Sequence, residues 1–581
     1  MKRLFILTFM LCCCMLQGFA HEYTDENGVT WTFDAYYPGT ARLTSASNYD
    51  TEVVVPEKVS DGTTEYTVDE LYTTFRNNTT IEKVTLPQIP IVIYNAFEFC
   101  SNLKEVVNSQ YITKCTTGAF GATALKTIDL SNCEYVGGFD GSKNLETVIL
   151  KKCTTIEERA FINCSSLKSL GETSSVKNLG YEAFRGCTNL SKIELPICTN
   201  IGSRAFYDCY SLTKIYIPAC TTIGESTFYS CGLKEVVLSE SITELPSDLF
   251  NWCNNLTTIN LSNITKISSS AFRYCSSLTK ISLPACTSIA QGAFEGCNSL
   301  KEINLPICNT IGDAVFVDCN SLTDITLSDK INTIGKDAFG TIEKVTINAT
   351  KVPSFGGGLY NTIILVPKDA LNSYKTADNW KEYAGKILAI GEKTDYDVTT
   401  TALDNTPGLL QQLDRDKLNN IVTLKVSGTI NGYDIMLFRN KMDNLHHLDL
   451  SDADIVANPY EYYEGYCTHD SIIENNAFTN LDKLITVKCP KSVKQIASAF
   501  NFCQNLKTII LPEKLEYIGG GGNHGTFFGC TSLTNVVFTK CREIGDYTFY
   551  NCKSLQNIDL PEGLTKIGQA AFFLLYLEPY N

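Results

Sequence analysis

Apolar residues recur in this chain with a period of about 22 residues between Phe184 and Phe339. One copy runs from Phe184 to Phe206, and its fixed positions are Phe184, Cys187, Leu190, Ile193, Leu195, Pro196, Cys198, Ile201, Gly202 and Phe206. A fixed period of roughly 20–50 residues is typical of a solenoid, in which each unit buries its apolar face only against its neighbours. We therefore expect long surfaces and few deep pockets.

The spacing within one copy predicts the elements of a coil. Ile193 and Leu195 alternate with polar residues, which favours a short β-strand with two side chains pointing inward. The segment 201–206 then predicts a helical or 3₁₀ turn that carries Phe206 back into the core. One coil thus consists of a strand, a turn, a second short turn on the convex side, and a segment that leads back to the next strand.

The motif Leu190-x-x-Ile193-x-Leu195-x-x-Cys198 matches the core of a leucine-rich repeat. Together with the proline after the strand and the A-F-x-x-C signature, it resembles the BspA-like leucine-rich repeats of bacterial surface proteins. The resemblance covers about residues 70–546, with breaks. It implies an α/β solenoid of right-handed coils with a parallel β-sheet face, and adhesion to host or neighbouring-cell proteins as the function.

The repeats divide the chain into two arrays joined by a linker. A strand-rich cap, with a hairpin between 53–55 and 66–68, is expected to shield the first coil because an open solenoid end exposes core and strand edge. Pro407 is expected to start a helix in the second module, and the chain ends where a further strand was due, so its last coil is either truncated or sealed by apolar residues. The expected segments are a signal peptide (1–20), an N-terminal β cap (21–70), array 1 (71–350), a strand–helix C-terminal cap (351–389), a linker (390–405), an entry segment (406–472) and array 2 (473–581).

The first twenty residues predict export. Lys2 and Arg3 precede an apolar run that ends with Gly18 and Ala20, the pattern of a secretory signal peptide cleaved before His21. Lipoprotein processing is the alternative, because cysteines lie inside the run, but none follows the small residue that such processing usually requires. No later apolar stretch approaches the ~20 residues that a membrane-spanning helix needs. We therefore expect a secreted or cell-surface protein that does not span a membrane.

The charge balance bears on the partner. Without Lys2 and Arg3 the mature chain has 46 basic and 63 acidic residues, a net charge of −17. An acidic surface argues against nucleic acid as a partner. We therefore expect the partner to be an extracellular protein or a glycan.

Cysteines mark the repeat, and their spacing allows three interpretations: metal ligands, buried free thiols or disulfides. One column has the full period and a second lies halfway between; together they are Cys187, Cys209, Cys231, Cys253, Cys275, Cys297 and Cys319, with Cys198, Cys220, Cys286 and Cys308. Aliphatic residues replace the second column in other coils (Ile242, Ile264, Ile331, Leu515 and Leu564), which a metal ligand would not permit. A ladder of buried free thiols is the favoured interpretation. Disulfides along a column are the alternative, since neighbouring strands lie only ~4.8 Å apart.

The residue types that catalysis requires are sparse. After Glu22, histidine occurs only at His446, His447, His469 and His524, so the first array lacks the partner for a Ser-His or Cys-His nucleophile. Cysteine pairs with metal-ligand spacing are absent after residue 20. We expect no cofactor, no metal and no enzymatic activity. Two hypotheses stay open beside adhesion: a glycan-acting enzyme or accessory glycan-binding subunit, using carboxylates that neighbouring coils bring together, and a passive surface-coat component.

The outward positions of successive strands form the predicted concave face. They are mostly Lys, Glu, Ser, Thr and Asn, which are rare among binding hot spots. The candidate contact residues are Lys192, Glu194, Lys214, Tyr216, Asn260, Lys280, Glu302 and Asn304. Exposed aromatic residues outside the core motif offer a second candidate surface, namely Trp252 and the cluster Tyr460, Tyr462, Tyr463 and Tyr466. Tyrosines packed under a long loop are an equally good interpretation of that cluster.

Overall fold

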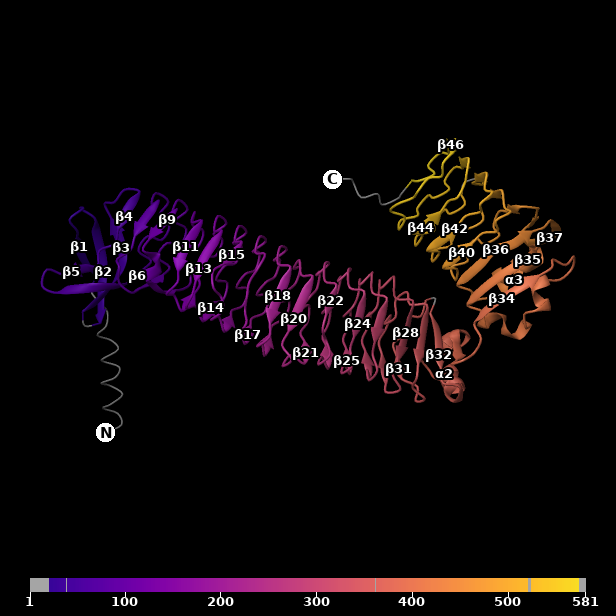
Figure 1. Cartoon of the computed structure of the whole chain (residues 1–581), viewed down its shortest axis with the longest axis horizontal. Coiled ribbons are helices and arrows are strands. Elements are labelled where there is room, and N and C mark those ends of the chain that lie inside the picture. Colours follow the sequence, from indigo (N-terminus) through magenta and orange to yellow (C-terminus); the bar gives the residue numbers. More distant parts are fainter. Residues whose placement is uncertain (1–19, 38, 361, 521–523, 574–581) are drawn as a thin grey trace. The chain divides into compact units, whose positions relative to one another are not determined.

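The computed structural model describes residues 20–37, 39–360, 362–520 and 524–573. The chain separates into two compact units, one of residues 1–360 with 378–380 and one of residues 361–377 with 381–581. The predicted signal peptide and the end of array 2 fall largely outside the described residues. Both units are stacks of coils whose strands run side by side from one coil to the next (Figure 1).

A strand cap begins unit 1. Strands β1 (His21–Thr24), β2 (Thr30–Tyr37) and β3 (Thr40–Ser47) pair antiparallel, and β3 joins β6 (Glu65–Tyr72) in parallel. The hairpin partner of β6 is β5 (Lys58–Ser60), whereas β4 (Glu52–Val54) pairs in parallel with β7 (Lys83–Thr85). The predicted hairpin was therefore wrong in its first strand, because residues 52–54 already belong to the ladder of the first array.

Each coil of array 1 contributes to two parallel ladders. The shorter-strand ladder consists of β8 (Ile91–Tyr94), β10 (Ile112–Cys115), β12 (Tyr135–Val136), β14 (Thr155–Ile156), β16 (Asn178–Leu179), β17 (Asn200–Ile201) and β19 (Thr222–Ile223), then β21 (Glu244–Leu245), β23 (Lys266–Ile267), β25 (Ser288–Ile289), β27 (Thr310–Ile311), β29 (Thr333–Ile334) and β31 (Ser354–Phe355). The expected helical turn is thus a two-residue strand followed by tight turns; the one short 3₁₀ helix described in this array is η1 (Ser109–Tyr111).

The longer-strand ladder carries the predicted concave-face positions. Its sheets are β4, β7 (Lys83–Thr85) and β9 (Glu105–Val107); β11 (Thr127–Leu130), β13 (Thr147–Leu150) and β15 (Ser169–Leu170); β18 (Lys214–Ile217), β20 (Glu235–Leu238) and β22 (Thr258–Ile259); β24 (Lys280–Ser282) and β26 (Glu302–Asn304); and β28 (Asp324–Leu327) with β30 (Lys344–Ile347). Residues 192–195 were predicted to be a strand but form none, although Ile193 and Leu195 are buried as expected.

A phenylalanine stack fills the core of array 1. Successive rings from Phe75 to Phe316 lie 5.1–6.0 Å apart between centroids and are nearly parallel. Trp380 lies against Phe355 at the far end of the unit, 4.4 Å between ring centroids, and its indole N–H donates to the Pro353 carbonyl. The apolar interior is therefore continuous from coil to coil.

Unit 2 begins with β32 (Ile363–Val366) and β33 (Ile387–Ala389), which pair in parallel. The helix expected between them is interrupted, as η2 (Lys368–Ala370), α2 (Leu371–Thr376) and η3 (Lys381–Lys386). Part of the predicted linker forms β34 (Asp395–Thr400), the first strand of the next sheet. The helix predicted from Pro407 is instead two 3₁₀ helices, η4 (Gly408–Gln411) and η5 (Arg415–Asn420).

Array 2 repeats the two-ladder plan. One sheet contains β34, β35 (Thr423–Ile430), β36 (His447–Ile455), β40 (Thr486–Lys488), β42 (Thr508–Ile510) and β44 (Asn535–Val537); the other contains β39 (Ile472–Ile473), β41 (Gln495–Ile496), β43 (Tyr517–Ile518), β45 (Glu543–Ile544) and β46 (Lys566–Ile567). Helix α3 (Gly432–Asn440) connects β35 to β36, and Asn431 with Asp434 forms its capping box. The hairpin β37 (Asn458–Tyr463) and β38 (Tyr466–Thr468) follows.

Candidate binding surfaces

The predicted contact residues all lie exposed on the longer-strand face of array 1. Their positions follow from strand alternation, since Ile215 and Ile217 point into the core while Lys214 and Tyr216 point outward. Tyr216 is 48% exposed. The structure thus places these residues along one face of successive coils.

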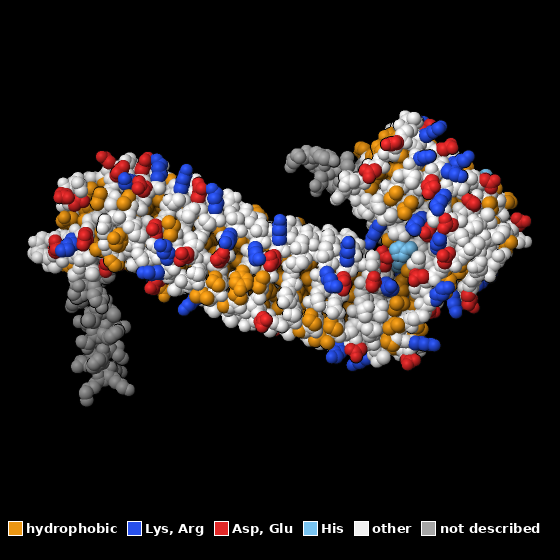
Figure 2. Space-filling model, viewed as in Figure 1, with side chains coloured by type: hydrophobic (Ala, Val, Ile, Leu, Met, Phe, Trp, Pro, Cys, Tyr) orange, Lys and Arg blue, Asp and Glu red, His pale blue; other side chains and the backbone are white. Residues whose placement is uncertain are grey.

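Charged side chains on this face pair with one another across neighbouring strands. Lys214 Nζ lies 3.0 Å from Glu235 Oε2, and Lys280 Nζ lies 2.8 Å from Glu302 Oε1. Figure 2 shows blue and red side chains lying next to one another along the first array. Exposed pairs of this kind contribute only about 0.2–1 kcal/mol each. Their main effect is to leave the longer-strand face polar and locally neutral.

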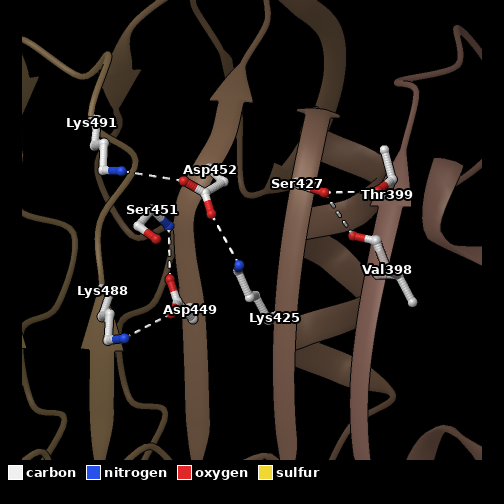
Figure 3. Close-up of polar contacts among 9 residues, drawn as sticks. All are labelled: Val398, Thr399, Lys425, Ser427, Asp449, Ser451, Asp452, Lys488 and Lys491. Carbon is white, nitrogen blue, oxygen red and sulfur yellow. Dashed lines mark hydrogen bonds and ion pairs between the residues drawn. The ribbon is translucent and has the colours of Figure 1, made fainter.

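Array 2 has the same arrangement on its sheet (Figure 3). Asp452 accepts from Lys425 at 3.0 Å and from Lys491 at 3.2 Å, while Lys488 bonds Asp449 at 2.8 Å. These contacts from lysine lower the pKa of Asp452. Charge compensation across strands is therefore a property of both arrays.

An open depression lies on the longer-strand face between β26 and β28. It has a volume of about 440 Å³ and is lined by polar and charged side chains that include Glu302, Asn304, Asp324 and Thr326. Glu302 is already paired with Lys280. A polar depression of this kind differs from the apolar, enclosed cavity in which enzymes usually hold a small substrate.

The cysteines of the predicted ladder are buried free thiols. In the full-period column each S–H donates to the carbonyl of the phenylalanine one coil back, as Cys253 does to Phe228 at 3.0 Å and Cys275 to Phe250 at 3.1 Å. In the half-period column the thiol bonds the carbonyl two residues on, as Cys286 does to Ser288 at 3.3 Å. The thiols therefore supply hydrogen bonds as well as volume inside the core.

Burial also makes these thiols poor nucleophiles. It raises the pKa of Cys198 to about 12 and the pKa of Cys286 to about 11, with weaker opposing effects from backbone hydrogen bonds. The aliphatic replacements Ile242, Ile264 and Ile331 are buried as well. Across the described ranges, no group of three or more His, Cys, Asp or Glu side chains is placed to hold a metal ion.

A different surface stands out at the turn that follows each buried phenylalanine. The second residue after that phenylalanine has a φ of 58–75° in each coil from Gly186 to Asp318. Most coils have Gly, Asn, Asp or Ser at this position, which are small residues or residues that tolerate a left-handed backbone. They are Asn163, Gly186, Asp208, Ser230, Gly296 and Asp318. We call this the left-handed turn position.

Four aromatic residues break that rule. Phe99, Trp252, Tyr274 and Phe502 occupy the left-handed turn position with φ between 58° and 63°. A bulky residue there costs on the order of 1–3 kcal/mol. Phe99 is 50% exposed and Trp252 is 43% exposed, so burial does not offset that cost.

Trp252 and Tyr274 form one of two aromatic pairs that lie in four successive coils on this edge. Their ring centroids are 4.4 Å apart, and Tyr207 and Tyr229, each directly after a buried phenylalanine, stack at 4.4 Å with an interplanar angle of 2°. We call Tyr207, Tyr229, Trp252 and Tyr274 the aromatic ridge. Trp, Tyr and Arg are the residues enriched at protein interaction hot spots.

A second cluster occupies the same turn in array 2. Phe528 lies 5.4 Å from Phe502 and stacks on Tyr550 at 4.8 Å, and Tyr550 lies 5.5 Å from Phe573, which is 56% exposed. The sequence pattern directed attention to Trp252 but missed these clusters. A signal was available, because aromatic residues are conspicuous in a column otherwise rich in Gly, Asn and Asp.

The tyrosines of the β37–β38 hairpin are largely occupied inside the fold. Tyr462 is 4% exposed and donates to the Asn475 carbonyl at 2.7 Å. Tyr460 stacks on Tyr433 with 3.7 Å between ring centroids. Packing beneath the loop is thus the interpretation that fits these two residues.

Comparison with known families decides the classification. The model of the "BspA type Leucine rich repeat region (6 copies)" matches residues 70–191, 135–257, 243–358 and 471–579, which is more than half of the chain. The chain belongs to the BspA-type leucine-rich repeat family. This confirms the resemblance and the repeat fold expected from the sequence. No curated protein matches the chain.

Several solved structures resemble this BspA-type protein. A leucine-rich repeat protein from Bacteroides ovatus is 18% identical over 92% of this chain and 94% of its own, with a TM-score of 0.28. A leucine-rich repeat protein of T. pallidum is 31% identical over 34% and 82%, with a TM-score of 0.24. A leucine rich cell surface protein from Faecalibacterium prausnitzii is 15% identical over 90% and 95%, with a TM-score of 0.15.

Within the part of the BspA-type chain that the structure describes, no helix combines the length and the apolar character needed to cross a bilayer.

Proposed function

We propose that this chain is an exported, non-enzymatic binding protein that holds a macromolecular partner at or beyond the cell surface. Family membership and the amino-terminal export pattern support this assignment. The observation that carries it is the placement of side chains: the thiols are buried as core filler, while long polar faces and aromatic turns remain outside. A surface of this kind spreads affinity over many coils.

The longer-strand face is proposed to provide polar contacts to the partner. Lys214 and Tyr216 lie side by side on β18, and the other candidates (Lys192, Glu194, Asn260, Lys280, Glu302 and Asn304) continue the same face. Polar rim contacts steer association and set specificity more than they supply affinity. Replacing Lys214 and Tyr216 with alanine is therefore expected to weaken binding by only a few-fold.

The test is a parallel binding screen. The mature chain, residues 21–581, is immobilised and probed with a panel of purified extracellular glycoproteins and a glycan array. Saturable binding to a macromolecule is the expected result. Failure to bind across both panels, or polysaccharide hydrolysis that disappears on changing Glu302→Gln and Asp324→Asn, would sink the proposal.

A further inference from the structure

We propose that the aromatic ridge on the turn edge of array 1 is an anchor site for a protein segment that carries a basic side chain among apolar ones. The inference rests on the proposed binding function and specifies the site and the chemistry of its partner. It concerns a surface separate from the longer-strand face.

The backbone supplies the first line of support. Trp252 and Tyr274 hold φ values of 63° and 58° at a position where other coils use residues such as Gly296 or Asp208. The Tyr274 ring lies over Gly296 of the next coil, where a Cβ atom would fall 2.2 Å from the ring. Two consecutive coils thus carry a large aromatic ring at a position where the backbone conformation is unfavourable for it. This placement indicates a role other than stabilising the fold.

The way the rings pack favours a protein over a sugar. Tyr207 and Tyr229 cover one another at 4.4 Å, and the Arg185 guanidinium lies over Tyr207, 5.4 Å from its centroid. The Arg273 guanidinium lies 4.8 Å from the centroid of Tyr274. A sugar usually stacks on a flat ring face, and faces of Tyr207 and Tyr274 are already covered by an arginine and a neighbouring ring. Rings combined with hydroxyl groups and carboxylates suit the mixed apolar and polar contacts of a protein interface.

The charges around the ridge favour a basic group on the partner. Asp208 directly follows Tyr207, and Asp248 lies in the turn of Trp252, where its carboxylate accepts from Asn251 Nδ2 at 2.7 Å. Burial, Tyr207 and the carboxylates of Asp248 and Asp208 raise the pKa of Tyr229. Neither aspartate forms an ion pair with Lys or Arg within the described ranges. The arginines beside the ridge are already paired, Arg185 with Glu182 at 2.7 Å and Arg273 with Glu295 at 2.6 Å. A basic side chain of the partner could therefore pair with these carboxylates beside the rings.

The experiment uses a random dodecapeptide library displayed on phage and selected on the full mature chain. Selected peptides are expected to combine Lys or Arg with apolar residues and to bind more weakly as salt increases. Trp31 and Trp380 are buried whereas Trp252 is exposed, so binding at the ridge should shift the tryptophan emission to shorter wavelength.

Matched variants separate this site from the rest of the surface. Trp252→Gly is expected to weaken peptide binding at least tenfold and to abolish the emission shift, without lowering the melting temperature, because glycine suits the left-handed backbone. Tyr135→Thr is the control, because Tyr135 on β12 is as exposed as Trp252, at 43%, and has no place in either proposed binding surface; it should leave peptide binding unchanged.

The outcomes distinguish the two proposals. Three results would each contradict the ridge as a protein anchor. They are selected peptides that are acidic or wholly polar, an unchanged affinity after Trp252→Gly, and a glycan ligand whose binding requires Trp252. If the parallel screen still finds a macromolecular partner that depends on Lys214 and Tyr216, the proposed function stands while this inference fails. If neither the library nor the screen gives a ligand, both fail.

Discussion

At the scale of single residues, the cysteine is the most informative part of the repeat. In the full-period column its thiol fills a small interior space and donates to a phenylalanine carbonyl of the preceding coil, which also accepts a backbone N–H. In the half-period column Ile264 takes the position of a cysteine and is buried, although its side chain cannot donate a hydrogen bond. The cysteine side chains therefore contribute mainly by packing in the core, with a weak hydrogen bond in addition, as buried free cysteine often does.

Thiol reactivity tests this role. In the native mature chain, DTNB should label Cys467, the one half-exposed cysteine of the described residues, and all 22 cysteines should react after unfolding. Rapid labelling of many native thiols would contradict the buried ladder.

The raised thiol pKa values also predict the dependence of stability on pH. A buried thiol such as Cys198, with a pKa of about 12 against an ordinary value of 9.0, stays protonated in the folded state when the unfolded thiol ionises. The folded state then binds more protons, so the free energy of unfolding should be unaffected by these groups below pH 9 and fall between about pH 9 and 12. Urea unfolding at pH 8, 9 and 10 checks this; a rise in stability across that range would contradict it.

At the scale of elements, each coil depends on the phenylalanine stack. Phe228 is buried between Phe206 and Phe250, with 5.6 Å to each ring centroid. Phe228→Ala should destabilise unit 1 by about 3–5 kcal/mol, because it removes a large buried side chain and leaves a cavity. Calorimetry should show the transition of unit 1 lowered and that of unit 2 unchanged, since coils contact only their neighbours.

Tyr216→Ala is the matched control, because that side chain is exposed on the same array and should change stability by no more than about 0.5 kcal/mol. Equal losses for both variants, or a loss in both transitions after Phe228→Ala, would be inconsistent with a stack of locally packed coils.

The sequence was a good guide where one residue type serves one purpose in every coil. The phenylalanine and cysteine columns, and the alternation of Ile215 with Tyr216, predicted which side chains are inside. Two-residue strands such as Asn200–Ile201 were missed because an alternating pattern needs more positions to be visible. Strand β34 was assigned to a linker because its residues are polar, although its partner β35 satisfies its backbone.

The candidate binding surfaces were harder to predict from the sequence than the buried core. Outward-facing strand positions could be located, since alternation fixes them, but their pairing into neutral rows depends on the register between strands. The aromatic ridge depends on backbone conformation, because Trp252 is unusual only once the left-handed φ of its column is known. Its two ring pairs come from four successive coils and form only in the folded array.

At the scale of the whole molecule, the repeat separates stability from recognition. The core of each array is closed by stacked rings, thiols and aliphatic side chains, so the remaining variation between coils lies on faces and turn edges. Aromatic clusters recur at the same turn in both arrays, with Trp252 in the first and Phe502 in the second. Two such anchors in one chain would increase avidity for a partner with repeated epitopes.

Hydrogen–deuterium exchange with and without a saturating selected peptide tests the binding edge most directly. The account predicts slower exchange in the turns 207–210, 229–232, 250–254 and 272–276, with the strands 214–217, 235–238 and 258–259 unchanged. Protection confined to those strands, with the turns unaffected, would contradict it.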